Sequence, residues 1–119
     1  MKTTAQTGAN ARATLSHAID GLWDRFLPDI TERVVVLESA AKAVAGRKLS
    51  AKQREAAQAA AHKLAGVLGT FGLTRGTVLA RELELTFSRE SSPGPEASAK
   101  LGATVAELRS MVESRKSST

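Results

Sequence analysis

Apolar residues recur along this chain three or four positions apart, which is the period of an amphipathic helix and not of a strand. Near the N-terminus the first such stripe is formed by Leu15, Ile19, Leu22 and Phe26. It predicts a helix over residues 10–26. Because proline disfavours helical dihedral angles in the residue before it, we expect Pro28 to break or kink this helix.

A second stripe begins directly after Pro28, which is itself well suited to the first position of a helix. The stripe consists of Ile30, Val34, Leu37, Ala41 and Val44. Gly46 is the expected end of this helix, since glycine is the residue most common just past a helix C-terminus.

The third helical pattern runs from Ser50 to Gly72. Ser50 and Gln53 have the spacing of a capping box, in which a hydroxyl and an amide satisfy free backbone groups at a helix start. With about 100° between successive residues, one broad arc is apolar, formed by Ala56, Ala57, Ala60, Ala61, Leu64, Val67, Leu68 and Phe71. His62 points away from this arc. Its expected neighbours on the solvent face are Gln58, Ala59, Ala65, Gly66 and Gly69.

Two further stripes complete the chain. The first predicts a helix over residues 74–89 and consists of Leu79, Leu83 and Phe87. A linker rich in serine and proline follows at residues 91–95. The last helix is expected to end near Glu113, and its stripe consists of Leu101, Val105, Leu108 and Val112.

These patterns predict an all-α protein, an up-and-down antiparallel four-helix bundle with an additional N-terminal helix. We expect the bundle over residues 10–113. Residues 1–9 are expected to form a disordered N-terminus, and residues 114–119 a frayed C-terminus.

The composition removes several classes of function. The 119 residues include no cysteine, which excludes disulfides, thiol catalysis and the usual zinc-finger patterns. No apolar run approaches the ~20 residues that span a bilayer, and the N-terminus lacks a stretch of signal-peptide type. We therefore expect a soluble, cytoplasmic protein without a membrane partner.

A formal net charge of +5 suggests an acidic partner, whether nucleic acid, a membrane surface or an acidic protein. The basic residues are scattered, and the chain has no tyrosine and few other aromatic residues, so base stacking is not expected. A small basic nucleic-acid-binding protein would account for the charge but would leave His62 and its neighbouring glycines unexplained. We expect no specific nucleic-acid partner.

Two glycines inside the third helix draw attention to His62. Each costs about 1 kcal/mol relative to alanine. Gly66 follows His62 by four residues on the same face, where a side chain would crowd a molecule approaching the imidazole. The alternative is that Gly66 and Gly69 admit a neighbouring helix, although the expected packing face is the opposite one. The pattern favours an exposed histidine on a docking surface over an ordinary solvated one.

The segment from Ala61 to Gly72 resembles the histidine phosphotransfer (HPt) domains of multistep two-component phosphorelays. In the family motif a histidine is followed by a hydrophobic residue two positions later and by glycines four and ten positions later. The matching residues are His62, Leu64, Gly66 and Gly72. The likeness covers roughly residues 22–87. The family often has a lysine three residues after the histidine, and this chain has Ala65 there, with Lys63 as the nearest cation.

The resemblance implies a phosphocarrier and not an enzyme. His62 would accept a phosphoryl group from an aspartyl phosphate on a receiver domain, of a response regulator or hybrid histidine kinase, and pass it to another receiver. It implies no cofactor of the chain's own, since the receiver supplies the Mg²⁺. Gln58 and Lys63 are then candidates to contact the phosphoryl oxygens. The candidate receiver-binding positions are Ala65, Gly66 and Gly69, and a monomer is expected.

An alternative of a different class is a non-catalytic helical domain that docks on a histidine kinase or receiver and inhibits it. A well-placed His62 speaks against this reading. His17 lies beside the first stripe and is expected to be a boundary residue without chemistry. With two histidines and no cysteine, no metal site is expected.

Overall fold

The computed structural model describes residues 2–88 and 95–117, with side chains over 11–88 and 96–115. It contains four helices: α1 (Lys2–Ala45), α2 (Ala51–Thr70), α3 (Thr74–Ser88) and α4 (Pro95–Ser117). The predicted linker at 91–95 lies almost wholly outside the described residues.

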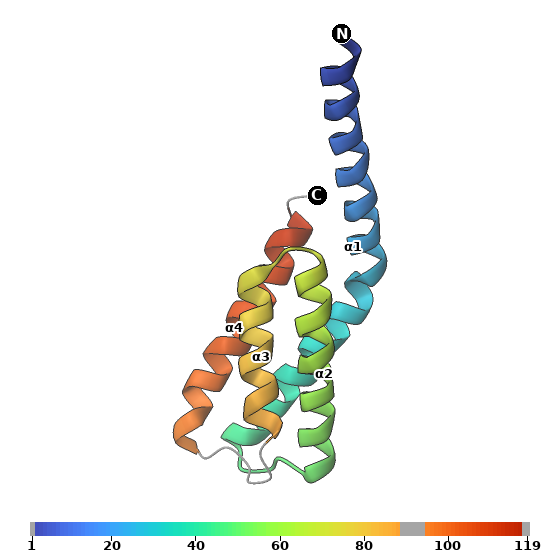
Figure 1. The fold of residues 1–119 in the computed structure, drawn as a ribbon. Coiled ribbons are helices and arrows are strands. Elements are labelled where there is room, and N and C mark those ends of the chain that lie inside the picture. The colour runs from blue at the N-terminus through green and yellow to red at the C-terminus, as the bar shows by residue number, and fades with distance from the viewer. Residues whose placement is uncertain (1, 89–94, 118–119) are drawn as a thin grey trace.

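The four helices form an up-and-down antiparallel bundle (Figure 1). Each helix packs against the next one along the chain, and α4 closes the bundle by packing against α1. The most extensive contact is between α2 and α3, which lie side by side (Figure 1). The predicted four-helix bundle is therefore confirmed.

The separate N-terminal helix that we expected is not found. The two helices predicted on either side of Pro28 are one continuous helix, α1, with Pro28 inside it. Figure 1 shows the axis of α1 changing direction in its light-blue segment, where the helix enters the bundle. Buried side chains on both sides of the proline, Trp23 and Ile30, hold the helix together across the lost backbone hydrogen bond.

The first apolar stripe does not face the core. Leu15 is 61% exposed, and Leu22 and Phe26 are exposed as well. Figure 1 shows the N-terminal part of α1 extending beyond the ends of the other helices. The stripe reaches the bundle only at its edge, where Ile19 is half-buried and the ring of Phe26 meets that of Phe71 at a centroid distance of 6.2 Å. Burial begins at Trp23, whose ring meets that of Phe71 edge-on at a centroid distance of 5.2 Å.

The remaining stripes meet inside the bundle. Its largest fully buried side chains come from all four helices: Trp23, Phe87, Ile30, Leu37, Leu64, Leu68, Leu79, Leu83, Leu108 and Val34. Ala56 is an exception to the predicted arc of α2, since it is exposed. Apart from that residue and the partly buried Val67 and Phe71, the apolar arc of α2 is buried, which leaves the opposite face of α2 free for function.

The ends of α2 follow the sequence. The Ser50 hydroxyl accepts a hydrogen bond of 3.0 Å from the backbone N–H of Gln53. At the other end Gly72 has φ +74°, and the N–H of Leu73 donates to the carbonyl of Leu68 at 2.9 Å. This is a Schellman turn closed by glycine, as the sequence predicted.

α1 ends at Ala45, directly before Gly46 as predicted, but the turn that follows has an unexpected residue in its left-handed position. Arg47, and not Gly46, adopts the left-handed conformation, with φ 56°. The N–H of Lys48 donates to the carbonyl of Ala43 at 2.8 Å, so the turn has the same hydrogen bonding as the end of α2. A non-glycine residue therefore occupies the position that glycine suits best.

The helices also extend further than expected. α1 begins at Lys2, within the segment predicted to be disordered, and α4 continues to Ser117, past the predicted end at Glu113. None of the helices, within the part of the chain that the structure describes, contains a stretch long and apolar enough to cross a membrane.

Candidate functional site

His62 lies near the middle of α2 and points out of the bundle. Its side chain is 73% exposed, whereas Ala61 and Leu64 beside it on the helix are fully buried. This is the consequence of the apolar arc: the core takes one face of α2 and leaves His62 on the other.

Glu84 of α3 contacts the imidazole from the side. Its Oε2 lies 2.7 Å from Nδ1 of His62, and its side chain is 30% exposed. An ionised carboxylate only accepts hydrogen bonds, so the Nδ1–H group of His62 donates a hydrogen bond to Oε2 of Glu84. In the neutral ring the lone pair is then on Nε2, the nitrogen that Glu84 does not contact. The contact therefore leaves Nε2 as the exposed ring nitrogen with a free lone pair.

Sequence reasoning missed Glu84. The signal was its position directly after the buried Leu83, which places a carboxylate at the border of the α3 stripe. Identifying its partner required the register of α3 against α2, and no pattern within one helix contains that information.

The two glycines beside His62 have different surroundings. A Cβ built on Gly66 meets no atom within 4 Å, so the surface next to His62 is open there, as expected. A Cβ on Gly69 would lie 3.3 Å from Oγ1 of Thr77 in α3. Gly69 thus admits a neighbouring helix, which was the alternative explanation for both glycines.

Ala65 is not on the solvent face as predicted. It is only 6% exposed, and its carbonyl accepts a hydrogen bond of 3.2 Å from the hydroxyl of Thr77. Ala65 lies about 60° from His62 around the helix, on the side that α3 covers. It therefore belongs to the packed contact between α2 and α3, and a receiver would not reach its side chain.

The other two candidates remain near the site. Lys63 is exposed, one position along α2 and about 100° around the helix from His62. Gln58 is half-buried one turn before His62. Among the described side chains, neither Lys63 nor Gln58 forms a hydrogen bond with the imidazole.

The strongest electrostatic interactions lie away from His62. Two hydrogen bonds from the Arg109 guanidinium, one of them 2.8 Å long, lower the pKa of Glu38 and join α4 to α1. The Arg75 guanidinium lowers the pKa of Glu107 in the same way and joins α3 to α4. These pairs connect helices across the bundle and take no part in the chemistry of His62.

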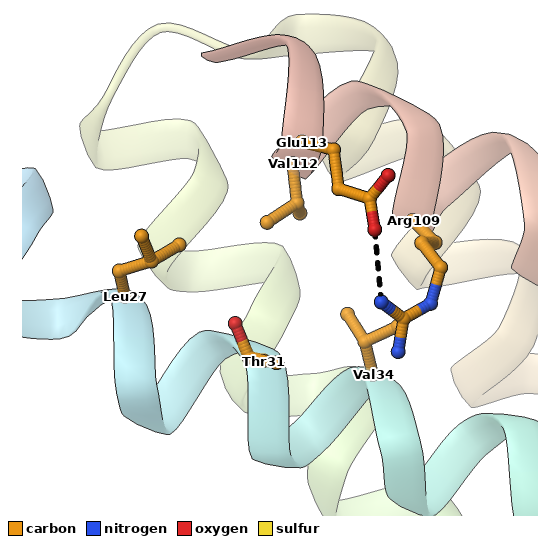
Figure 2. Close-up of a pocket in the computed structure, with 6 residues that line it drawn as sticks. All are labelled: Leu27, Thr31, Val34, Arg109, Val112 and Glu113. Carbon is orange, nitrogen blue, oxygen red and sulfur yellow. Dashed lines mark hydrogen bonds and ion pairs between the residues drawn. The ribbon is translucent and has the colours of Figure 1, made fainter. Parts of the chain in front are cut away.

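A small pocket of about 100 Å³ lies between α1 and α4. Figure 2 shows Leu27, Thr31 and Val34 of α1 facing Val112 and the Arg109–Glu113 pair of α4 across this hollow. None of its lining residues belongs to α2 or α3, so it is separate from the surface around His62. Among the described residues no group of three or more histidine or acidic side chains is placed to hold a metal ion.

Comparison with known proteins indicates a family for most of the chain. The model of the Hpt domain family matches residues 21–117. Protein RcaC of Microchaete diplosiphon is 39% identical over 62 residues, which are 52% of this chain and 10% of that protein. The matched part of the chain therefore spans only about a tenth of the length of this curated relative. No solved structure matches the chain significantly.

Proposed function

This chain belongs to the Hpt domain family, which implies a phosphocarrier role in a phosphorelay, and from that premise we propose that His62 is the residue that carries the phosphoryl group. It receives the group from an aspartyl phosphate of a receiver domain and donates it to the aspartate of another receiver. The observation that carries the proposal is the exposed imidazole with its Nδ1 proton bound by Glu84.

The chemistry follows from that hydrogen bond. The Nε2 lone pair attacks phosphorus, the bond from phosphorus to the aspartyl oxygen breaks, and the carboxylate leaves with the electron pair. The ring then carries a positive charge shared with Nδ1–H, which the Glu84 carboxylate stabilises. In the reverse direction the receiver carboxylate attacks phosphorus and Nε2 leaves as a neutral imidazole nitrogen. Glu84 is thus a positioning residue, since it touches the imidazole and not the phosphoryl group.

The partner is expected to supply the rest of the reaction. A receiver's acidic pocket and Mg²⁺ neutralise the phosphoryl oxygens during transfer. On this proposal the chain contributes a nucleophile and an open surface, with no cofactor of its own. We retain the expectation of a cytoplasmic monomer.

The test is phosphorylation of wild-type and His62→Gln protein by a labelled phospho-receiver. The wild type should acquire phosphate that is lost in acid and kept in alkali, as a phosphoramidate is. His62→Gln should acquire none, while its helical circular dichroism is unchanged, because the side chain buries no core area. Phosphorus–nitrogen couplings in NMR spectra should place the phosphoryl group on Nε2.

His17→Gln is the matched control and should accept phosphate at the wild-type rate. Acid-labile phosphate on the His62→Gln protein would place the acceptor elsewhere. Phosphate on Nδ1 of His62 would contradict the role given to Glu84.

A further inference from the structure

A phosphoryl group on His62 would need a nearby cation to offset its negative charge, and this chain has no lysine at the position that the family often uses. A phosphoryl group on Nε2 brings about two negative charges to a surface that already holds the Glu84 carboxylate, 2.7 Å from Nδ1. Ala65 cannot help, because its side chain is uncharged and buried. A cation on the open side of His62 would offset this charge.

The register of α3 against α2 places a cationic residue, Arg81, near the level of His62. Glu84 meets His62, and two turns earlier on α3 Thr77 bonds the carbonyl of Ala65. Arg81 lies between these two contacts, one turn before Glu84. On the antiparallel α2, Gly66 lies one turn after His62. Arg81 and Gly66 therefore lie at about the same level on the two helices, one turn from His62 and Glu84.

Arg81 is also on the correct side of α3. It is exposed and lies about 60° around the helix from Glu84, which contacts His62, whereas its neighbour Ala80 is fully buried. One helical turn is about 5.4 Å, a separation that arginine side chains bridge in ion pairs one turn apart. The bare surface of Gly66, with no atom within 4 Å of a built Cβ, leaves the path to His62 open.

The guanidinium is available. Arg75 and Arg109 are held in ion pairs, but no hydrogen bond or ion pair to another described residue occupies Arg81. Lys63, the rival cation, is the next residue after His62, and side chains adjacent in sequence do not face each other on a helix.

We propose that Arg81 binds the phosphoryl oxygens of phosphorylated His62 across Gly66, so that α3 supplies the cation missing from α2. A guanidinium forms paired hydrogen bonds with two phosphoryl oxygens, which an ammonium group does not. The inference rests on the proposed function, since it requires phosphorylation of His62.

The experiment uses potassium phosphoramidate, a small phosphoryl donor, so that no partner protein is involved. The proteins compared are wild type, Arg81→Gln, Arg81→Lys, Lys63→Gln and, as a control of equal charge change on α4, Lys100→Gln. The first readout is the pH titration of the phosphohistidine ³¹P signal. A nearby cation favours the dianion, so the titration midpoint of Arg81→Gln should lie about 0.5 pH unit above that of the wild type.

The second readout is the lifetime of the phosphohistidine, which Arg81→Gln should shorten about threefold through loss of a partly solvated contact. Arg81→Lys should give intermediate values, Lys63→Gln should have a smaller effect than Arg81→Gln, and Lys100→Gln should match the wild type. Unchanged midpoint and lifetime in Arg81→Gln would overturn the inference, as would a larger effect of Lys63→Gln. If wild-type His62 acquires no phosphate from phosphoramidate or from a phospho-receiver, the proposed function itself fails.

Discussion

The contact between His62 and Glu84 joins two helices, so its geometry depends on how α2 and α3 pack. On α2 the apolar arc excludes His62 from the core, and on α3 the buried Leu83 places Glu84 at the helix border. Thr77 and Gly69 fix the distance between the helices, since the Thr77 hydroxyl lies 3.3 Å from a built Gly69 Cβ. Small residues where the helices meet thus hold the imidazole against its carboxylate.

Replacing Gly66 by glutamine should weaken docking of a receiver without lowering the stability of the fold. The new side chain has open space, and removal of a glycine from a helix interior should raise the free energy of unfolding by about 0.5–1 kcal/mol. The same side chain would cover the surface beside His62. We expect transfer from a phospho-receiver to fall at least tenfold while the midpoint of thermal unfolding holds or rises.

Gly102→Gln is the matched control, because Gly102 is likewise an exposed helix residue with no atom near a built Cβ. It should show the same gain in stability and the wild-type transfer rate. Loss of stability in the Gly66 variant with normal transfer would show that Gly66 serves helix packing.

At the scale of elements, the helix ends show which local signals are decisive. α2 ends in a left-handed glycine, Gly72, and α1 ends in the same turn with Arg47 in that position. At the end of α1 the glycine, Gly46, lies one residue before the left-handed position of the turn. The hydrogen bonds of the turn therefore determine where α1 ends, and Arg47 is left in a conformation that L-residues rarely adopt.

Arg47→Gly should therefore stabilise the protein. Relief of the left-handed conformation is worth about 1 kcal/mol, partly offset by the greater freedom of glycine in the unfolded chain. We expect a net gain of about 0.5 kcal/mol in the free energy of unfolding by urea, with phosphorylation of His62 unchanged. Gly72→Ala, the converse change, should cost about 1 kcal/mol, and a stability loss in Arg47→Gly would mean that the arginine side chain holds the turn.

At the scale of the whole molecule, the protein divides into a bundle and a projecting part of α1. The molecule is 65 Å long and about 20 Å across, and Figure 1 shows the upper part of α1 projecting beyond the other helices along the long dimension. The family model begins at residue 21, close to the first fully buried side chain, Trp23. The start of the family match and the first fully buried side chain thus place the beginning of the bundle at nearly the same point of the chain.

A chain that begins at Ala18 should accordingly keep the bundle. It retains Asp20, whose carboxylate accepts a hydrogen bond of 2.8 Å from Arg115, and it loses only exposed side chains among those described before residue 18. We expect its midpoint of thermal unfolding within about 3 °C of the full chain and the same rate of phosphate uptake. A fall of 10 °C or more would show that the removed segment packs against something in solution.

Sequence periodicity alone determined the all-helical class, the faces of α2, α3 and α4, the exposure of His62 and the open surface at Gly66, because each of these depends on the order of residues within one helix. Tertiary structure alone decided that α1 is continuous through Pro28, that Leu15, Leu22 and Phe26 remain exposed, that Ala65 is buried and that Glu84 meets His62. These features depend on where one helix ends relative to its neighbours and on the register between helices. The spacing of hydrophobic residues contains no information on helix ends or on register. An apolar stripe shows which face of a helix needs a partner, but not whether a partner is present.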